Sequence, residues 1–287
     1  MQLPLCASHP SNLAARWQIG VQPWGAHILS ATRVEAAQSR EIFYLSPFSS
    51  GPGAPVRGGV PVLFPQFNEL GPLPKHGLAR TARWSLLHTE VQGGATIGAR
   101  LGLELEPTVH PAWPHSASLS LAIETAGDAL TITLVVTNGG VTTFDWTGGL
   151  HPYFAVDDIR QCALTGLEEV PVADKTTPAL SRQPTGPVTW LGDLFERLYD
   201  SDSPVVLETG GYRLRLSMRG FDQWMVWNPG GTVAAMLPDL PDADWRRFVC
   251  VEPVRVARPG RLEPGESFVG QLEIRYLKDQ TARRQVC

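Results

Sequence analysis

The fold class follows from one stretch of the sequence, Ala117-Ser-Leu-Ser-Leu-Ala-Ile-Glu-Thr-Ala-Gly-Asp-Ala-Leu-Thr-Ile-Thr-Leu-Val-Val-Thr137. On both sides of Gly127-Asp128 apolar residues recur at every second position, which is the pattern of a half-buried β-strand. The residues of this apolar face are Leu119, Leu121, Ile123, Leu130, Ile132, Leu134 and Val136. The stretch therefore predicts two antiparallel strands, Ala117–Glu124 and Ala129–Thr137, joined by a tight turn.

The same alternation recurs later in the chain, in Tyr212–Met218 and in Phe268–Tyr276. Gly210-Gly211 is predicted to join Val205–Thr209 to the first of these as a two-residue hairpin, since such turns need positive φ. Helical periodicity is confined to Leu191–Tyr199, where we expect a short helical turn or two. Amphipathic strands linked by tight turns indicate an all-β protein, a large antiparallel β-sandwich with few short helices.

Composition is that of one folded globular domain. Apolar residues make up 43% of the chain and charged residues 18%, which excludes an intrinsically disordered protein. The 28 glycines and 25 prolines favour many turns between short strands. No change in composition divides the 287 residues, so we expect a single domain over 1–287, with frayed ends near 1–12 and 279–287.

Charge and hydropathy limit the partners and the compartment. The net charge of −4 and the lack of a basic stripe argue against nucleic-acid binding. No apolar window is long enough for a membrane span, and the N-terminus does not resemble a signal peptide. The cysteines are scattered, as expected for free thiols: Cys6, Cys162, Cys250 and Cys287. We expect a soluble, cytoplasmic monomer.

Glu252 is a candidate general base. It follows the apolar run Phe248–Val251, and strand alternation places Glu252 and Cys250 together on one face. A carboxylate among apolar neighbours at a strand end is partly desolvated, which raises its proton affinity and suits a general base. The alternative is an edge-strand glutamate in plain solvent.

His151 is a candidate for proton transfer, because imidazole is the side chain best suited to it near neutral pH. In an extended segment His151 and Tyr153 share a face, and Pro152 predicts a strand end or a sheet edge. The alternative is a histidine that is hydrogen-bonded into local structure.

Arg57, Lys75, His76 and Arg80 lie in a region punctuated by glycine and proline. Unpaired charge is costly to bury in a core. We therefore expect these residues to face an anionic, oxygen-rich ligand, for which the planar guanidinium of arginine is well shaped. The alternative is a set of solvated surface cations.

No metal site or cofactor is predicted. The histidines lack HxH and HExxH spacing, and the cysteines form no CxxC pair. No GxSxG, GxGxxG or P-loop motif occurs.

Seven short motifs follow one another along the chain. In their order and in their residues they resemble the glucose-6-phosphate 1-epimerases (hexose-6-phosphate mutarotases) of the aldose 1-epimerase superfamily. The motifs are Arg57-Gly-Gly-Val-Pro61, Phe64-Pro-Gln-Phe67, Gly71-Pro-Leu-Pro-Lys-His-Gly-Leu-Ala-Arg80, Leu150-His-Pro-Tyr-Phe154, Asp174-Lys175, Val226-Trp-Asn-Pro229 and Val249-Cys-Val-Glu252. The resemblance extends from about Arg57 to the final strand. It implies a galactose-mutarotase-like β-supersandwich with an open cleft.

The resemblance also implies catalytic roles. Glu252 corresponds to the general base of the family and His151 to its general acid. His76 matches a second active-site histidine, which helps to bind and polarise the sugar near its ring oxygen.

Four further residues match substrate-binding positions. Arg57, Lys75 and Arg80 are among them, and the two arginines are candidates for binding a phosphate. Asp174 matches an acidic position that hydrogen-bonds sugar hydroxyls. The implied ligand is a small sugar phosphate, and the implied chemistry needs no cofactor.

The chain departs from the family pattern at Pro152 and Thr81, where threonine and asparagine are usual. These departures affect the prediction of the substrate more than the prediction of the reaction type. One alternative is a mutarotase for unphosphorylated aldoses, and another is a non-catalytic sugar-binding sandwich. A glycoside hydrolase or lyase is a third, and a hydrolase would require two suitably spaced carboxylates.

Overall fold

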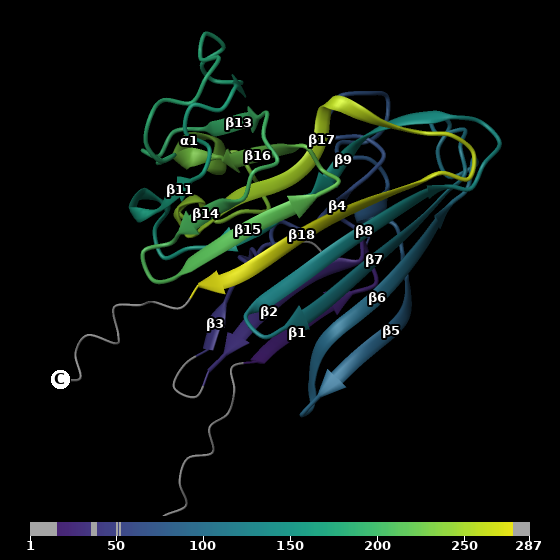
Figure 1. The fold of residues 1–287 in the computed structure, drawn as a ribbon, viewed down its shortest axis with the longest axis horizontal. Coiled ribbons are helices and arrows are strands. Elements are labelled where there is room, and N and C mark those ends of the chain that lie inside the picture. The colour runs from purple at the N-terminus through teal and green to yellow at the C-terminus, as the bar shows by residue number, and fades with distance from the viewer. Residues whose placement is uncertain (1–15, 36–38, 50, 52, 278–287) are drawn as a thin grey trace, which may run out of the picture.

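The computed structural model describes residues 16–35, 39–49, 51 and 53–277. The predicted frayed ends at 1–12 and 279–287 lie outside these ranges. Within the described part, no helix has the length and apolar character needed to cross a membrane. Every ladder between its named strands is antiparallel and the helices are short, so the all-β prediction is confirmed (Figure 1).

The largest sheet contains the stretch from which the fold was predicted. Its strands, in spatial order, are β11 (Ala163–Thr165), β14 (Val205–Glu208), β15 (Arg213–Arg219), β18 (Ser267–Leu277), β8 (Ala129–Asn138), β7 (Ala117–Ala126), β6 (Ala95–Leu105) and β5 (Ser85–Gln92). Gly127 adopts a φ of 56° in the turn between β7 and β8. Gly210 has a φ of 84° between β14 and β15, so both predicted hairpins are confirmed.

A second sheet holds the candidate catalytic residues. Its strands run in the order β12 (Val172–Asp174), β13 (Phe195–Tyr199), β16 (Gln223–Asn228), β17 (Phe248–Leu262), β9 (Phe144–Leu150) and β4 (Val62–Leu63), and β10 (Tyr153–Ala155) also pairs with β17. The predicted helical turn over Leu191–Tyr199 is wrong, because Phe195–Tyr199 is strand β13. Its ladder to β16 supplies hydrogen bonds that the local pattern did not signal.

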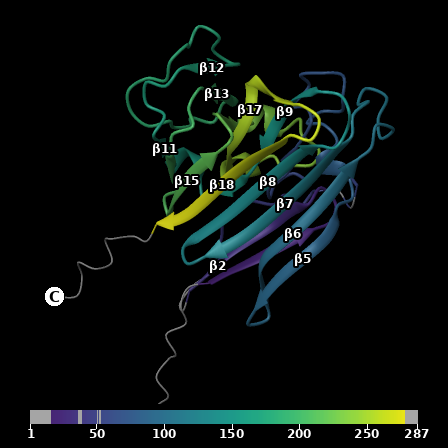
Figure 2. The same ribbon diagram turned by 45° about the vertical axis from the view of Figure 1, so that its right-hand side comes forward.

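A small third sheet and a few single-turn helices complete the described part. The sheet consists of β1 (Arg16–Gln22), β2 (His27–Val34) and β3 (Ser39–Glu41). The helices are α1 (Gly230–Ala234) and the 3-10 turns η1 (Ala79–Thr81), η2 (Ile159–Gln161) and η3 (Asp244–Arg247). Strand β1 packs against β6, so the small sheet lies beneath the large one (Figures 1 and 2).

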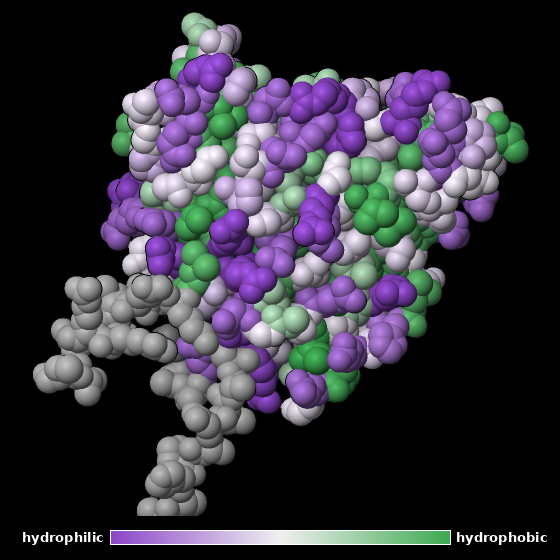
Figure 3. Space-filling view, in the orientation of Figure 1, coloured by the Kyte–Doolittle hydropathy of each residue, from purple (hydrophilic) through white to green (hydrophobic). Residues whose placement is uncertain are grey.

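Alternation in the strands separates the core from the surface. On β8 the predicted apolar face, from Leu130 to Val136, is fully buried, while Thr131 and Thr133 are only partly so. Figure 3 shows that the side of the molecule turned to the viewer is largely hydrophilic, with scattered hydrophobic residues. The sheets are therefore held together through their inner faces, as in a β-sandwich.

Candidate active site

Glu252 lies inside strand β17 rather than at a strand end. It pairs with Met225 of β16, and its side chain is almost completely buried, with 1% of the residue exposed. The sequence prediction placed the carboxylate at the end of the apolar run, but the ladder continues beyond it to Leu262. Glu252 therefore sits in a fixed backbone within a sheet, where its position is determined by neighbouring strands.

His151 lies opposite Glu252 in the register of the same sheet. On β17, Cys250 pairs with Tyr153 of β10 and Val254 pairs with Gly149 of β9. This register, continued through the intervening residues, places His151 across from Glu252. The backbone N–H of His151 bonds instead to the carbonyl of Pro61, which holds the break between β9 and β10 in place.

Gly149 allows β9 to approach β17 closely enough for this pairing. A Cβ at position 149 would lie 2.2 Å from the carbonyl oxygen of Pro253 and 2.9 Å from the Cα of Val254. Both contacts are with backbone, which cannot swing aside as a flexible side chain can. A glycine two residues before the histidine is therefore required by the geometry that brings His151 to Glu252.

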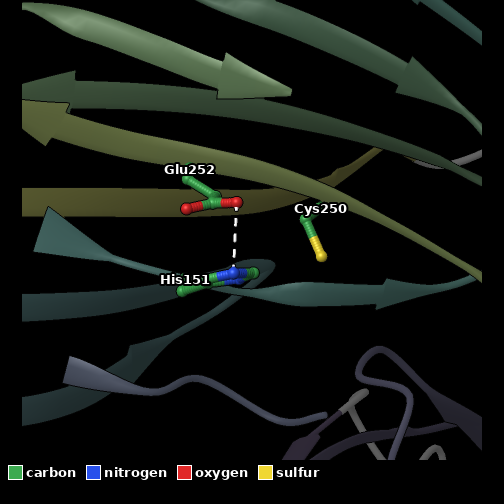
Figure 4. A group of neighbouring side chains, drawn as sticks. All are labelled: His151, Cys250 and Glu252. Atoms are coloured by element: carbon green, nitrogen blue, oxygen red, sulfur yellow. Dashed lines mark ion pairs between the residues drawn. The ribbon is translucent and has the colours of Figure 1, made fainter. Parts of the chain in front are cut away.

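The His151 Nε2 atom lies 3.4 Å from the Glu252 Oε1 atom (Figure 4). Burial raises the pKa of Glu252 well above its ordinary value, and the nearby carboxylate of Glu196 adds to the effect. Burial, followed by the positive field of His76 and Arg57, lowers the pKa of His151 well below its ordinary value. Both shifts favour the uncharged pair, with the proton on Glu252 and His151 neutral, and the pair becomes an ion pair when that proton moves to His151.

The pair opens into a cavity of about 420 Å³, a volume typical of small-molecule sites. Six of the seven residues predicted from the sequence line this cavity: Arg57, Lys75, His76, Arg80, His151 and Glu252. They come from loops and strands that are far apart in the chain.

Asp174 is the predicted residue that does not line the cavity. One of its carboxylate oxygens accepts a hydrogen bond of 2.6 Å from Arg197, and the other accepts bonds from Thr176 and Thr177. These bonds lower the pKa of the carboxyl against the opposing effect of burial, so Asp174 is an ionised residue that fixes the chain after β12. Its neighbour Lys175 reaches the cavity instead.

His76 is held as a neutral hydrogen-bond donor. Its Nδ1 atom accepts a hydrogen bond of 3.2 Å from the backbone N–H of Asn68, so the proton of the neutral ring is on Nε2. Burial, then the charges of Arg80 and Lys75, lower the pKa of His76 to about 3. Its backbone has a φ of 65°, an uncommon conformation for a side chain of this size.

The cations around the cavity are of two kinds. Arg57 is bound through Nε and one terminal nitrogen to Asp239, at 3.0–3.2 Å, and its other terminal nitrogen lies 3.4 Å from the hydroxyl of Tyr153. By contrast, the side chains of Lys75 and Arg80 make no hydrogen bond or ion pair with any other residue in the described ranges. The cavity therefore contains a fixed guanidinium, two cations that are available to a ligand, and Lys175, which is paired with Glu196.

Chemically, the arrangement can move protons on a small, oxygen-rich molecule. A buried carboxyl and an imidazole share one proton on one side, and a neutral histidine can donate from another. Available cations lie within the same cavity and can receive an anionic group.

A comparison with known families places the whole chain. The family profile described as aldose 1-epimerase matches residues 14–275, which is most of the chain. The protein belongs to the aldose 1-epimerase family. It is thus an isomerase of the mutarotase type, and the resemblance noted in the sequence is confirmed at this level.

Individual relatives of this aldose 1-epimerase agree with the assignment. It is 32% identical over 243 residues to an Escherichia coli protein provisionally named glucose-6-phosphate 1-epimerase, covering 79% of this chain and 76% of the relative. A Cenchrus ciliaris protein with the same provisional name is 29% identical over 233 residues, with coverages of 78% and 71%. A Salmonella typhimurium crystal structure, provisionally titled a mutarotase, has a TM-score of 0.79 at 26% identity and covers 92% and 88%.

Several cavity residues of this epimerase were missed by sequence reasoning. Trp227 lies in a recognised motif, and its ring centroid is 5.9 Å from the Arg57 guanidinium. Glu196 also lines the cavity and pairs with Lys175 at 3.1 Å. Asp239 gave no local signal, because its loop reaches Arg57 only through the tertiary fold.

Proposed function

We propose that this epimerase interconverts the α and β anomers of an aldohexose 6-phosphate, with glucose 6-phosphate as its substrate. The observation that carries the proposal is that Lys75 and Arg80, two cations without a partner among the described residues, line the same cavity as the His151–Glu252 pair. A neutral sugar would leave the partly desolvated charge of Arg80 without a counter-ion, which is unfavourable. The provisional names of the Escherichia coli and Cenchrus ciliaris relatives support the same substrate.

The proposed reaction moves two protons and breaks one bond. Glu252 takes the proton of the C1 hydroxyl while His151 gives a proton to the ring oxygen, and the C1–O5 bond opens to the free aldehyde. Rotation about C1–C2 exposes the other face of the aldehyde. Reclosure with the roles reversed restores both groups, so no cofactor enters the balance.

The single proton of the pair suits this reaction. The reactive state has an ionised Glu252 and a protonated His151, which differs from the resting neutral pair only by a transfer over 3.4 Å. A sugar that lies against both groups accepts a proton at one oxygen and loses one at another, so the net charge of the site does not change. General acid–base assistance of this kind accelerates a reaction by about 10²–10⁴-fold.

The remaining cavity residues would position the sugar. His76, which carries its proton on Nε2, would donate a hydrogen bond to the ring oxygen or a neighbouring hydroxyl. Arg80 and Lys75 would bind the phosphate, because they have no competing partner. Arg57 would contribute its charge from a fixed position, since Asp239 already occupies part of its guanidinium.

The structure provides a reason to favour this reaction over glycoside hydrolysis. Two further carboxylates line the cavity, but Glu196 is paired with Lys175 and Asp239 is paired with Arg57. Neither is available as a partner acid or nucleophile for Glu252. Hydrolysis by a pair of carboxylic acids would require one of them to be released from its salt bridge.

Anomer equilibration measured by exchange NMR tests the proposal. The protein should accelerate the interconversion of α- and β-glucose 6-phosphate, with a value of kcat/KM at least about 10-fold higher than for glucose, as expected for a charge-assisted contact. Equal values for the two sugars would instead assign the enzyme to unphosphorylated aldoses. The experiment tests the preference for the phosphorylated sugar alone, because the protein acts as a mutarotase under both outcomes.

A further inference from the structure

Cys250 lies beside the His151–Glu252 pair and offers a third potential metal ligand. It lies two residues before Glu252 on β17, and both side chains project from the same face of the strand toward His151 (Figure 4). One ligand atom from each of the three residues can be chosen so that all three lie within 4.8 Å of one another. The proposed proton transfers do not use this thiol, so its position requires a separate explanation.

The distances are close to those of a tetrahedral metal site. For bonds of about 2.0–2.3 Å at tetrahedral angles, neighbouring ligand atoms are about 3.3–3.6 Å apart. The His151–Glu252 distance of 3.4 Å already lies in this range. The thiol, which lies within 4.8 Å of the other two ligand atoms, would have to approach them by up to about 1.5 Å, which rotation about its χ1 angle can provide.

Two buried polar atoms of the cluster lack a hydrogen-bond partner among the described residues. Glu252 is 1% exposed and His151 8% exposed, yet Glu252 Oε2 and His151 Nδ1 have no hydrogen-bond partner in the described part of the chain. Cys250 is completely buried and is not in a disulfide. A buried carboxyl oxygen without a partner is costly, and a cation bound by the Glu252 carboxylate would attract Oε2 as well as Oε1.

We propose that Cys250, His151 and Glu252 bind a thiophilic divalent cation such as Zn²⁺, and that the bound cation blocks the acid–base pair. The thiolate and the carboxylate would balance the two charges of the cation, and neutral His151 would be the third ligand. Binding would release the proton of the thiol and the proton that the pair shares. The fourth position would face the cavity, where water or a sugar oxygen can bind.

The ligand types determine which cations fit. One sulfur, one imidazole nitrogen and one carboxylate oxygen are ligands that Zn²⁺ and Co²⁺ accept, whereas Mg²⁺ requires oxygen ligands in an octahedral arrangement. The sequence contains no metal motif because His151 is brought to the Cys250-x-Glu252 segment only by the strand register. The prediction of no metal site rested on spacing within the sequence, which cannot detect such a site.

Cobalt binding tests the site without any use of sugar turnover. Co²⁺ added to the apo-protein should bind with a stoichiometry of one, and it should give the thiolate-to-metal absorption band in the near ultraviolet. The band should be lost in Cys250→Ser and kept in Cys162→Ser, a buried cysteine remote from the cluster. A Co²⁺ complex without the band, or an unchanged band in Cys250→Ser, would overturn the proposal.

A second set of variants keeps the test decisive if Cys250→Ser does not fold. His151→Asn and Glu252→Gln retain the thiol but each remove a ligand, so the dissociation constant for Zn²⁺ measured by calorimetry should rise by more than about 10-fold. Mg²⁺ should produce no heat of binding in any of these proteins. Affinity for Zn²⁺ that is the same in wild type and in both variants contradicts the site.

The activity measurement tests the second half of the proposal. Zn²⁺ should reduce the rate of anomer exchange in the wild type, a chelator should restore it, and Cys162→Ser should respond in the same way. In Cys250→Ser the ratio of the rates with and without Zn²⁺ should return toward one. If Zn²⁺ binds through Cys250 but leaves the wild-type rate unchanged, the cation does not block the pair. This readout needs only mutarotase turnover, so it is independent of the phosphate assignment.

Discussion

The imidazole of His151 and the carboxyl of Glu252 lie 3.4 Å apart because they occupy opposite positions on adjacent chains of one sheet. Directly opposite residues in an antiparallel pair have Cβ atoms about 4.5–5.5 Å apart, so the register alone brings the two side chains into contact. The acid–base pair is thus a property of strand pairing, and its geometry is as stable as the sheet.

Glu252→Gln and His151→Asn should each reduce the catalysed rate of anomer exchange by about 10²–10⁴-fold. Each substitution removes one of the two proton-transfer groups and keeps a similar shape. The double variant should be little slower than either single variant, because groups that act as a unit are not additive. Exchange NMR with glucose 6-phosphate measures all three, and Glu124→Gln, on the exposed side of β7, is the matched control. Wild-type rates in both single variants would disprove the assignment of the pair.

Arg80→Met should weaken the use of a phosphorylated sugar selectively. The side chain has no partner in the described residues, so it is free to form a charge-assisted hydrogen bond, worth about 1.5–3 kcal/mol. We expect kcat/KM for glucose 6-phosphate to fall by about 10–100-fold and that for glucose to change by less than about 2-fold. Arg219→Met, at the exposed end of β15, controls for the loss of a positive charge. Equal losses for both sugars would mean that Arg80 supports the fold rather than the phosphate.

Gly149→Ala should damage the site more than it damages the fold. The added methyl group would meet the carbonyl of Pro253 at 2.2 Å, so β9 has to move away from β17. Overpacking of this kind costs about 1–3 kcal/mol of the free energy of unfolding, which urea denaturation measures. The rate of anomer exchange in the folded variant should fall by more than 10-fold, about the effect of losing acid–base assistance.

The control for this glycine is Gly51→Ala, where a Cβ would meet nothing within 4 Å and the backbone does not have a positive φ. It should change neither the denaturation midpoint nor the rate. If Gly149→Ala has a wild-type rate, the close approach of β9 is not needed for catalysis.

The fold could be predicted from sequence wherever a strand has one buried and one open face. Leu130–Val136 alternates because its odd and even positions face core and surface. Strand β5, Ser85–Gln92, has no buried residue at all, so it carries no such signal. Phe195–Tyr199 was taken for a helical turn because its side chains do not alternate between buried and exposed: four are partly buried and the last, Tyr199, is fully buried. Pairing with β16 makes it a strand.

Candidate site residues could be predicted where a side chain able to transfer protons stands in a short segment with a distinctive local pattern. His151 stands beside two glycines and a proline, and Glu252 follows an apolar run, so each could be recognised separately. Their contact could not, since it depends on the register of β17. Asp239 was missed, and Asp174 does not line the cavity, because tertiary contacts with arginines that are distant in the sequence involve both residues.

Asp128→Asn should destabilise the protein by about 3 kcal/mol, because it removes the nearer of the two carboxylates beside a buried arginine, the other being Glu35 at 3.8 Å. Arg33 of β2 is 2% exposed, and its guanidinium bonds to the carboxylate of Asp128 and to the carbonyl of Gly127. The contact ties the three-stranded sheet to the β7–β8 hairpin. Urea denaturation measures the loss, and Asp157→Asn, whose side chain is 76% exposed beside Arg40, should cost less than about 1 kcal/mol. Similar losses in the two variants would show that Arg33 does not depend on its partner.

His27 should make the protein less stable in acid. Burial lowers its pKa from 6.5 to about 4, partly offset by the hydrogen bond of Nε2 with the Gly58 carbonyl at 2.7 Å. Between these pH values the unfolded chain binds a proton that the folded chain does not, so the stabilisation present above pH 6.5 is lost as the pH falls toward 4. The loss amounts to about 3 kcal/mol from this histidine.

Urea denaturation at a series of pH values measures this effect. In His27→Asn the free energy of unfolding should be lower at pH 7 than in wild type, and its slope between pH 6.5 and 4 should be smaller by about one proton, or about 1.4 kcal/mol per pH unit at most. The buried His76 continues to contribute in the variant, because its pKa is lowered to about 3. His88→Asn, on exposed strand β5, should keep the wild-type slope. A slope that is unchanged in His27→Asn would mean that His27 does not remain neutral in the folded protein through this range.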